Sequence, residues 1–322
     1  IGVACGWYSS EKDISLKSGF TVYNELSRSG WKVFLLIIND DEWYIKTSDI
    51  EKIKFSKNDF SFNYNKKNYK FNVIFNAVHG QPGEDGELAI LLDSKNIPHT
   101  SCNFSAANLT YSKKDCLIEA KKFNIATAKS IYIDSEDKLI ESEIINEIGL
   151  PCFVKANKAG SSFGVYRVSD KKMLRPSIKN AFKEDSQVVI ESELKGREVS
   201  VGVYKDIDGI KCLPVTEIIS ENEFFDYEAK YLGKAIEITP AQIPNEWIDS
   251  VIKTSIYLYK KFNLKGICRS EYIFVDDIPH LLEINSVPGL TEQSIVPKQC
   301  KAAGISLNLF FEKLLIEAIN KN

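Results

Sequence analysis

The chain has 322 residues, of which 44% are apolar and 26% are charged, the balance of a folded protein rather than a disordered one. Its length allows about two domains, or three small ones, each able to bury a core. Lysine and arginine number 41 against 44 aspartate and glutamate residues, a formal charge of −3. Affinity for nucleic acid or for an anionic membrane needs a cationic face, so this balance argues against a dedicated binder of either kind.

The longest apolar run, residues 33–38, has about a third of the length of a membrane-spanning helix. No basic-then-apolar signal segment is visible near the N-terminus. The seven cysteines are widely spread and form no C-x-x-C pair, a pattern typical of reduced thiols. We therefore expect a cytoplasmic protein.

The first elements predict a parallel sheet. Residues 2–5 predict a buried strand, and residues 16–26 predict a helix with apolar side chains on one face, closed by Gly30. Residues 32–38 predict a second strand. Strands joined through a helix in this order usually lie parallel in one sheet.

A hairpin and a helix follow. Residues 60–64 and 69–73 alternate with period two and predict a hairpin with a four-residue connection. An apolar helix is expected at 87–94, and we expect the first domain, residues 1–100, to end near Pro98.

The remaining elements predict two further units. For residues 101–190 we expect a small α+β unit with helices at 105–122, 140–148 and 171–183 and strands at 129–133, 152–156, 164–168 and 187–191. For residues 191–322 we expect strands at 200–204, 267–275 and 280–284 and helices at 245–262 and 305–319. The long connection 220–240 is expected to act as a lid.

The most concentrated motif is the glycine loop 160–164, which follows the strand bearing Lys155. Small residues let backbone N–H groups close on phosphate oxygens, and a nearby lysine adds positive charge. A tight turn between two strands is the alternative. The loop also fits a nucleophile elbow centred on Ser162, but an elbow needs a following helix, and here a strand is predicted.

A second group of polar residues lies on two consecutive predicted strands. Glu271 lies in the first, beside Arg269, whereas Glu283 and Asn285 lie two residues apart in the second and therefore share one face. Carboxylate and amide oxygens are ligands that Mg²⁺ prefers in proteins. The alternative is an ordinary polar face of a sheet, with Arg269 in an exposed ion pair.

Two connections add candidate residues. Segment 224–231 places four aromatic side chains, two acids and a lysine in a long loop, which indicates either a cap over a site or a packed surface loop. The glycine-rich turn 79–86 begins with His79. A lone histidine there is more often structural than catalytic, and the three histidines are too scattered to predict a zinc site.

Taken in this order, the motifs resemble those of the D-alanine–D-alanine ligases, a family of the ATP-grasp superfamily. The resemblance covers essentially the whole chain and rests on Ser9-Ser10-Glu11, His79-Gly80, Gly83-Glu84-Asp85-Gly86, Lys113, Lys155, 160–164, Glu191, Glu198, Lys230-Tyr231, Arg269, Glu283-Ile284-Asn285 and Pro288-Gly289-Leu290-Thr291. It implies a three-domain α/β ATP-grasp fold. Residues 1–100 would form a parallel-sheet domain with the first amino-acid site, and 101–190 and 191–322 would form two α+β subdomains that enclose the nucleotide.

The family resemblance also implies the reaction. The γ-phosphate of ATP passes to the carboxylate of one D-alanine, and the amine of a second D-alanine attacks the resulting acyl phosphate. The product, D-alanyl-D-alanine, serves peptidoglycan synthesis. Phosphoryl transfer of this kind needs positioning and charge neutralisation more than a protein nucleophile.

The resemblance assigns ATP and metal contacts residue by residue. Lys113 and Lys155 match the lysines that hold the phosphates and the adenine edge, and Ser162 lies in the loop that would fold over the triphosphate. Glu191 and Glu198 match the acids near the adenine amine and the ribose. The ligands expected for two Mg²⁺ (or Mn²⁺) ions are Glu271, Glu283 and Asn285. Glu271 stands where many relatives carry aspartate, and its extra methylene shifts the expected position of an ion.

The remaining assignments concern the amino acids. Arg269 matches the arginine that stabilises the oxyanion of the tetrahedral intermediate. Glu11 would hold the ammonium of the first D-alanine and would form a hydrogen-bonded set with Ser161 and Tyr231 that closes the lid. Lys230 would reach phosphate or the second carboxylate.

The second D-alanine carboxylate would bind at Gly289 and Ser294, and His79 would lie near the amino-acid site. Retention of Lys230-Tyr231 favours an amine acceptor over a hydroxy acid. Trp7 departs from the glycine pair common in the family and would either narrow the first pocket or pack outward.

Two alternatives stay open. A related ligase would use D-lactate or D-serine as acceptor, and a catalytically silent nucleotide-binding module would have lost residues that this chain retains. The expected partners are small molecules, D-alanine and ATP, with no nucleic acid or membrane, and the resemblance implies a homodimer.

Overall fold

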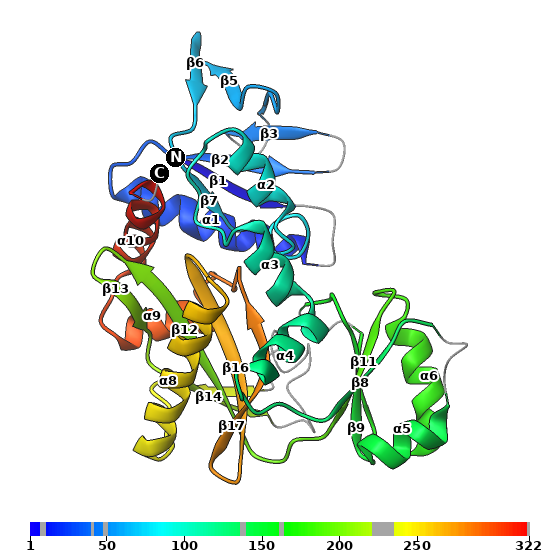
Figure 1. Ribbon diagram of the computed structural model, residues 1–322. Coiled ribbons are helices and arrows are strands. Elements are labelled where there is room, and N and C mark those ends of the chain that lie inside the picture. The colour runs from blue at the N-terminus through cyan, green and yellow to red at the C-terminus, as the bar shows by residue number, and fades with distance from the viewer. Residues whose placement is uncertain are drawn as a thin grey trace.

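The computed structural model describes residues 1–6, 11–39, 42–47, 51–135, 140–160, 164–220 and 235–320. The described strands form sheets of five, four and six strands and one separate hairpin. Figure 1 shows the five-stranded sheet at one end of the molecule, with the other two sheets facing each other across α4.

The first sheet has the order β4-β3-β2-β1-β7, and β1 pairs in parallel with both β2 and β7. This confirms the predicted β-α-β start. The elements of this part are β1 (Gly2–Gly6), α1 (Lys12–Arg28), β2 (Phe34–Ile38), β3 (Trp43–Lys46), β4 (Lys52–Lys54), β5 (Ser61–Tyr64), β6 (Lys67–Lys70), β7 (Ile74–Asn76) and α2 (Glu87–Ser94).

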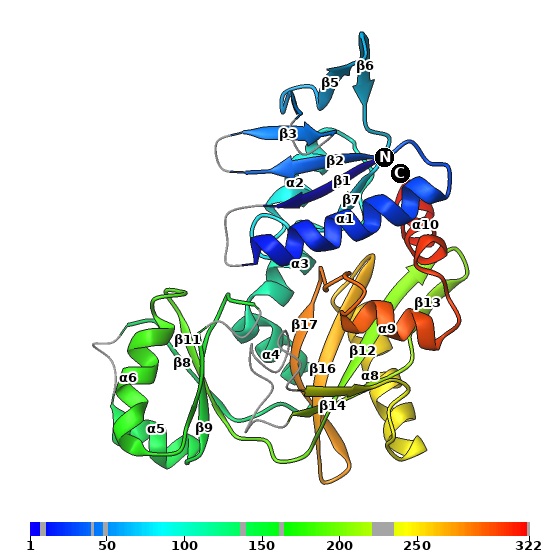
Figure 2. The same ribbon diagram turned by 180° about the vertical axis from the view of Figure 1, so that it is seen from behind.

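Helix α1 packs closely on β1, seen best from behind in Figure 2. Its buried face includes Ser18, Gly19 and Val22. A Cβ atom on Gly19 would lie 2.5 Å from Cys5 Sγ, so this close approach requires glycine. After the helix ends at Arg28, Gly30 adopts a φ of 84°, as its predicted role in closing the helix requires.

The predicted hairpin is present, but its connection is shorter than expected. Tyr64 pairs with Lys67, so only Asn65 and Lys66 connect β5 and β6. Both residues have positive φ, 48° and 61°, which defines the primed turn that matches the twist of a hairpin. The prediction was wrong by two residues because neither residue is glycine, the usual signal for such a turn.

The second sheet, with the order β10-β9-β11-β8, is antiparallel throughout. Its elements are β8 (Ser130–Ile133), α5 (Glu141–Ile148), β9 (Cys152–Ala156), β10 (Val165–Val168), α6 (Lys171–Ala181) and β11 (Val188–Ser192). Helices α5 and α6 cover the face that carries Val154 and Val188. The opposite face carries Lys155 and Glu191 and is turned toward the third sheet (Figure 1).

The predicted helix 105–122 is two helices, α3 (Phe104–Tyr111) and α4 (Lys113–Lys122). Ser112 interrupts them with an extended backbone, and its hydroxyl accepts a hydrogen bond from the Asp115 backbone N–H. Both helices pack into the core of the third sheet through residues such as Ala106 and Leu117.

The third sheet has the order β15-β14-β12-β16-β17, with β13 paired to β12. Its elements and the following helices are β12 (Arg197–Asp206), β13 (Gly209–Cys212), β14 (Thr216–Ser220), β15 (Ala235–Ile238), α8 (Asn245–Lys261), β16 (Ile267–Val275), β17 (Ile278–Asn285), α9 (Ile295–Ala302) and α10 (Leu307–Ile319). The expected connection 220–240 is thus partly strand. Its residues 221–234 lie outside the described residues.

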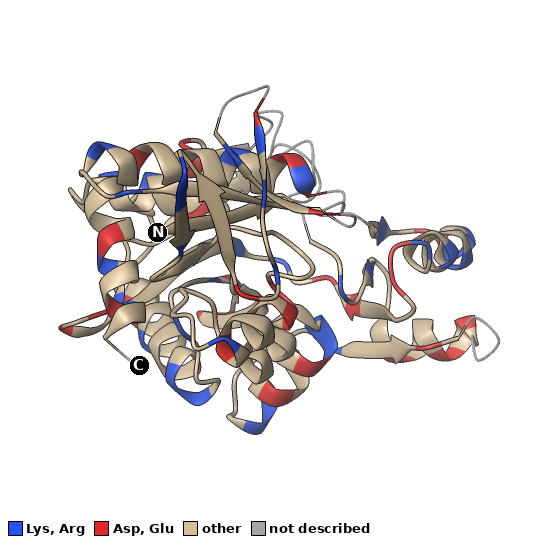
Figure 3. Ribbon diagram, turned by 90° about the horizontal axis from the view of Figure 1, so that it is seen from above, with Lys and Arg blue, Asp and Glu red and all other residues tan. Residues whose placement is uncertain are grey.

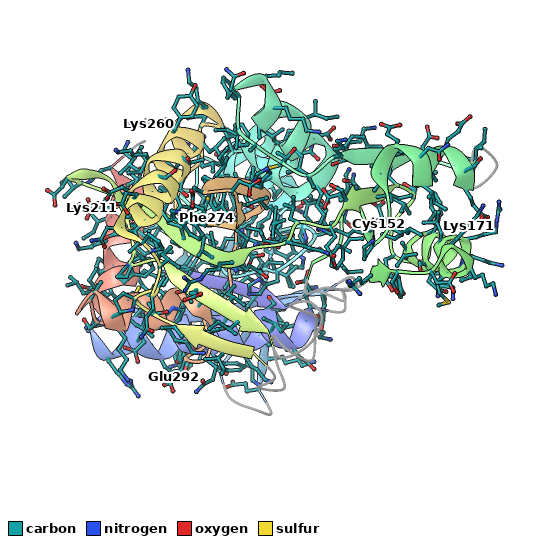
Figure 4. The ribbon with its side chains drawn as sticks, turned by 90° about the horizontal axis from the view of Figure 1, so that it is seen from below. Cys152, Lys171, Lys211, Lys260, Phe274 and Glu292 are labelled. Atoms are coloured by element: carbon teal, nitrogen blue, oxygen red, sulfur yellow. The ribbon has the colours of Figure 1, made fainter. Side chains whose placement is uncertain are left out.

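Aromatic contacts fix the helices on this sheet. Phe274 on β16 stacks on Trp247 of α8 with ring centroids 4.3 Å apart, and Figure 4 labels Phe274 beside that helix. At the end of the chain, Phe311 on α10 meets Phe75 of β7 edge to face at 5.4 Å, so the last helix joins the third sheet to the first.

None of the described helices is both long enough and apolar enough to cross a membrane. Basic and acidic residues are interspersed over all parts of the molecule in Figure 3, in keeping with the balanced composition.

Candidate active site

The polar face predicted from residues 269–285 is present on the third sheet. Across β16 and β17, Glu271 pairs with Glu283, and Arg269 pairs with Asn285. A bulge between Glu271 and Tyr272 shifts the register immediately after this pair. Ile284, between the two polar residues of β17, is buried in the core on the other side of the sheet, as the period-two pattern predicts.

Arg269 is held within this face. Its guanidinium donates hydrogen bonds to the carboxylate of Glu271 and, at 3.3 Å, to Ser200 Oγ on β12. Only 14% of the Arg269 side chain and 4% of the Glu271 side chain are exposed. The guanidinium charge therefore has a fixed position in a largely dehydrated environment, where a charge acts most strongly.

The oxygen donors fit Mg²⁺ better than a transition metal. Asn285 Nδ2 donates to Glu283 Oε1 at 3.3 Å, which leaves the amide oxygen of Asn285 as its donor atom for a cation. Within the described residues, no three His, Cys, Asp or Glu side chains gather closely enough to hold a metal ion by themselves. Two carboxylates and an amide match an ion that takes its remaining ligands from phosphate and water, as Mg²⁺ does.

Lys113 connects this face to the glycine loop. Its ammonium donates to the backbone oxygen of Ala159 at 2.6 Å and lies 3.5 Å from Glu283 Oε2. Next along the loop, a Cβ atom on Gly160 would lie 2.6 Å from Glu11 Oε1, so the Glu11 carboxylate lies close against the loop backbone. Glu11 is itself buried at the start of α1. The structure thus brings Glu11, Lys113 and Glu283 to one place.

Glu84 is a site residue to which the sequence analysis gave no role. It lines a cavity with Lys113, Gly160, Glu283 and Asn285, and its carboxylate accepts a hydrogen bond from the Gly80 N–H at 3.1 Å. Burial raises the pKa of Glu84 to about 8, and the neighbouring Glu11 carboxylate raises it as well. In the sequence, the one feature that could have marked Glu84 as a site residue was its position in the motif Gly83-Glu84-Asp85-Gly86.

This raised pKa predicts a pH-dependent stability. Because the folded state keeps the Glu84 proton, the free energy of unfolding should fall as pH rises from 4.5, the ordinary value, toward 8. In Glu84→Gln we expect a smaller fall over the same interval, measured by urea unfolding of both proteins. Parallel curves for the parent and the variant would contradict the assignment.

The two residues of the second sheet that were predicted to bind the nucleotide also meet. Lys155 Nζ lies 2.7 Å from Glu191 Oε2, and both side chains are mostly buried. Burial lowers the pKa of Lys155, but the charges of Glu191, Glu283 and Glu198 outweigh it and leave the pKa raised. Glu198 and Glu283 belong to the third sheet, and their charges act on Lys155 of the second sheet. The charged faces of the two sheets are therefore turned toward each other.

His79 is a buried connection between distant segments. Its Nε2 lies 3.1 Å from Ser18 Oγ on α1, and that oxygen accepts the Leu290 N–H at 3.2 Å. Burial lowers the pKa of His79 to about 4, and the Arg269 charge lowers it as well. A hydrogen bond with the Val287 backbone raises this pKa but does not outweigh the burial. The imidazole is therefore neutral at pH 7 and holds the loop 287–290 beside the first sheet.

The two residues expected at the second amino-acid pocket lie together. A Cβ atom on Gly289 would lie 2.8 Å from Ser294 Oγ, which also lies 2.8 Å from the Thr291 hydroxyl oxygen. Four other candidates, Ser161, Ser162, Lys230 and Tyr231, lie outside the described residues, as does Trp7.

Together, two facing sheets, a glycine loop at the edge of one and an acid–amide–arginine face on the other define an ATP-grasp enzyme. Family models described as D-ala D-ala ligase N-terminus and D-ala D-ala ligase C-terminus match residues 1–102 and 117–316. The chain therefore belongs to the D-alanine–D-alanine ligase family.

Individual relatives and solved structures support the same family. The chain is 46% identical over 312 residues to a D-alanine–D-alanine ligase of Flavobacterium johnsoniae, covering 97% of this chain and 96% of that protein. Among solved structures, the VanG D-Ala:D-Ser ligase of Enterococcus faecalis superposes with a TM-score of 0.85 at 26% identity, covering 98% and 97% of the two chains. The D-alanine–D-alanine ligase of Bacillus anthracis complexed with ATP gives 0.78 at 26% identity, covering 99% and 97%.

Proposed function

We propose that this protein joins two D-alanines to D-alanyl-D-alanine for peptidoglycan synthesis, with conversion of ATP to ADP and phosphate. The γ-phosphoryl group is transferred to a carboxylate oxygen of the first D-alanine. The amine of the second D-alanine then attacks the acyl carbon, and phosphate leaves. The observation that supports this best is the polar face of Arg269, Glu271, Glu283 and Asn285, which lies opposite Lys155 and Glu191.

Residue roles follow from these positions. We assign the triphosphate to the glycine loop, including Ser162, with Lys113 and Lys155, and the adenosine to Glu191 and Glu198. Glu271, Glu283 and Asn285 would hold two Mg²⁺ ions. Bound there, the ions would neutralise negative charge on the phosphates during transfer.

The remaining roles concern the amino acids. Glu11 binds the first ammonium, and its carboxylate reaches Gly160 at the start of the loop that contains Ser161. Arg269 stabilises the oxyanion that forms when the second amine attacks. Lys230 and Tyr231 close the site, and Gly289 and Ser294 receive the second carboxylate beside His79.

The domain division proposed is 1–100, 101–190 and 191–322, supported by three sheets whose strands come from 2–76, 130–192 and 197–285. We further propose that the enzyme acts in the cytoplasm as a homodimer, with D-alanine and ATP rather than nucleic acid or membrane as its partners.

The test is phosphate release from ATP and Mg²⁺ in the presence of D-alanine, L-alanine, D-serine, or D-alanine with D-lactate. We expect release when D-alanine is the only amino acid added and none with L-alanine, and mass spectrometry should identify D-alanyl-D-alanine, with no D-alanyl-D-lactate in the mixture. If a mixture of D-alanine and D-serine gave mainly the mixed dipeptide, the acceptor would be D-serine, as the name of the VanG D-Ala:D-Ser ligase states for that enzyme. If no D-amino acid provoked turnover, the ligase function would be excluded.

A further inference from the structure

The first turn of α4 obtains hydrogen bonds from a residue outside the helix. The first N–H groups of a helix have no partner within it. Here the Lys113 N–H donates to the backbone oxygen of Asn157 at 3.3 Å, and the Lys114 N–H donates to Asn157 Oδ1 at 2.8 Å. One residue, Asn157, thus satisfies two groups at the start of α4.

Asn157 also links the start of α4 to Gln187, the residue before β11. Its Nδ2 donates to Ser112 Oγ and to Gln187 Oε1, both at 3.1 Å, and its backbone N–H donates to the backbone oxygen of Gln187 at 2.9 Å. Asn157 has no exposed surface. Its amide is therefore fully engaged and has one defined orientation.

Asn157 lies between two parts of the nucleotide site. It follows β9, which carries Lys155, and it precedes Gly160 by three residues. The helix that it caps begins with Lys113, whose ammonium donates to the Ala159 oxygen at 2.6 Å. Figures 1 and 2 both show α4 between the second and third sheets. A shift of its first turn would therefore move Lys113 within the cavity that it lines with Gly160 and Glu283.

We propose that Asn157 is a positioning residue for the triphosphate of ATP. By fixing the first turn of α4 against the base of the glycine loop, it sets the place of the Lys113 ammonium relative to Ala159 and Gly160, where that loop begins. This inference rests on the proposed function, in which Lys113 and the loop hold the phosphates. Asn157 acts through Lys113 and touches no reacting atom.

The surroundings indicate that a variant can fold. A cavity of about 290 Å³ lies against Asn157 and is lined by Lys114, Tyr132, Asp134 and Gln187, among others. It is polar and wide enough for water. In Asn157→Ala, water can reach Ser112 and Gln187 in place of the lost amide.

The test is steady-state kinetics of Asn157→Ala. We expect kcat/KM for ATP to fall by about 10- to 100-fold, the range for misplaced binding groups, while KM for D-alanine stays unchanged. Asn157→Asp should recover most of the loss, because its carboxylate keeps the acceptor for the Lys114 N–H. The Ser112 hydroxyl and the Gln187 amide can each turn to donate to the new oxygens.

Two controls separate this role from general helix stability and from the proposed function. Asp170→Ala removes the cap of α6, where Asp170 accepts the Lys172 N–H at 2.9 Å, and it should not change KM for ATP. Figure 4 labels the adjacent Lys171 at the far end of the molecule. Lys113→Met should itself impair ATP use.

The outcomes are distinct. If Lys113→Met leaves ATP kinetics intact, the proposed role of Lys113 fails and the role of Asn157 fails with it. If Lys113→Met impairs ATP use but Asn157→Ala changes ATP and D-alanine kinetics equally, or changes neither, only the positioning role is overturned. Should Asn157→Ala not fold, Gln187→Ala removes a partner of the Asn157 amide without touching α4 and is judged by the same two outcomes.

Discussion

Replacing Glu283 with glutamine should lower turnover by about a hundredfold or more and raise the Mg²⁺ concentration needed for half-maximal rate. The substitution keeps the shape of the side chain but removes its charge from the face shared with Glu271 and Asn285. It also removes the ionic partner of Lys113, 3.5 Å away. Initial rates measured over a Mg²⁺ titration give both quantities.

The matched control is Glu217→Gln. Glu217 is also a buried carboxylate of the third sheet, but its partner is Arg197, with the guanidinium Nε 2.7 Å away, and it belongs to none of the proposed contacts. We expect lower stability and unchanged turnover. If Glu283→Gln kept parental turnover at saturating Mg²⁺, its assignment as a metal ligand would be wrong.

Replacing Arg269 with lysine should lower kcat by about 10²- to 10³-fold, the cost of removing one oxyanion donor. Lysine keeps the positive charge but not the rigid planar group that places Nη1 of Arg269 between the Glu271 carboxylate and Ser200 Oγ. The oxyanion is absent from the bound substrates and forms only in the tetrahedral intermediate and the transition states that flank it, so KM for both substrates should change little. Steady-state kinetics with ATP and D-alanine varied in turn provide the measurement.

Arg197→Lys is the corresponding control, because the Arg197 guanidinium also donates to a buried carboxylate of the third sheet, that of Glu217. Its kcat should equal that of the parent. A loss in Arg269→Lys that appears entirely in KM would mean that Arg269 binds the ground state and has no special role in the transition state.

Where local patterns were strong, the sequence predicted the elements well. The strands at 152–156 and 267–275 and the helix at 87–94 have the predicted bounds. Period-two alternation also placed Glu283 and Asn285 on one face correctly. In each case the apolar pattern and the burial in the fold agree, so local information was sufficient.

The errors arose where distant residues decide the local structure. At Ser112 a local cap is joined by Asn157, which lies 45 positions further along the chain and binds the start of α4. The pairing of Glu271 with Glu283 depends on a bulge that no local pattern marks. Glu84 has a perturbed pKa only because the fold buries it beside Glu11.

Activation of the carboxylate through an acyl phosphate can be followed by isotope transfer. D-alanine labelled in both carboxylate oxygens with the heavy oxygen isotope is incubated with ATP, Mg²⁺ and the enzyme, and the released phosphate is analysed by mass spectrometry. We expect one heavy oxygen in each phosphate formed with D-alanyl-D-alanine, because the bridging oxygen of the acyl phosphate leaves with the phosphorus. Phosphate that contained only ordinary oxygen would contradict this mechanism.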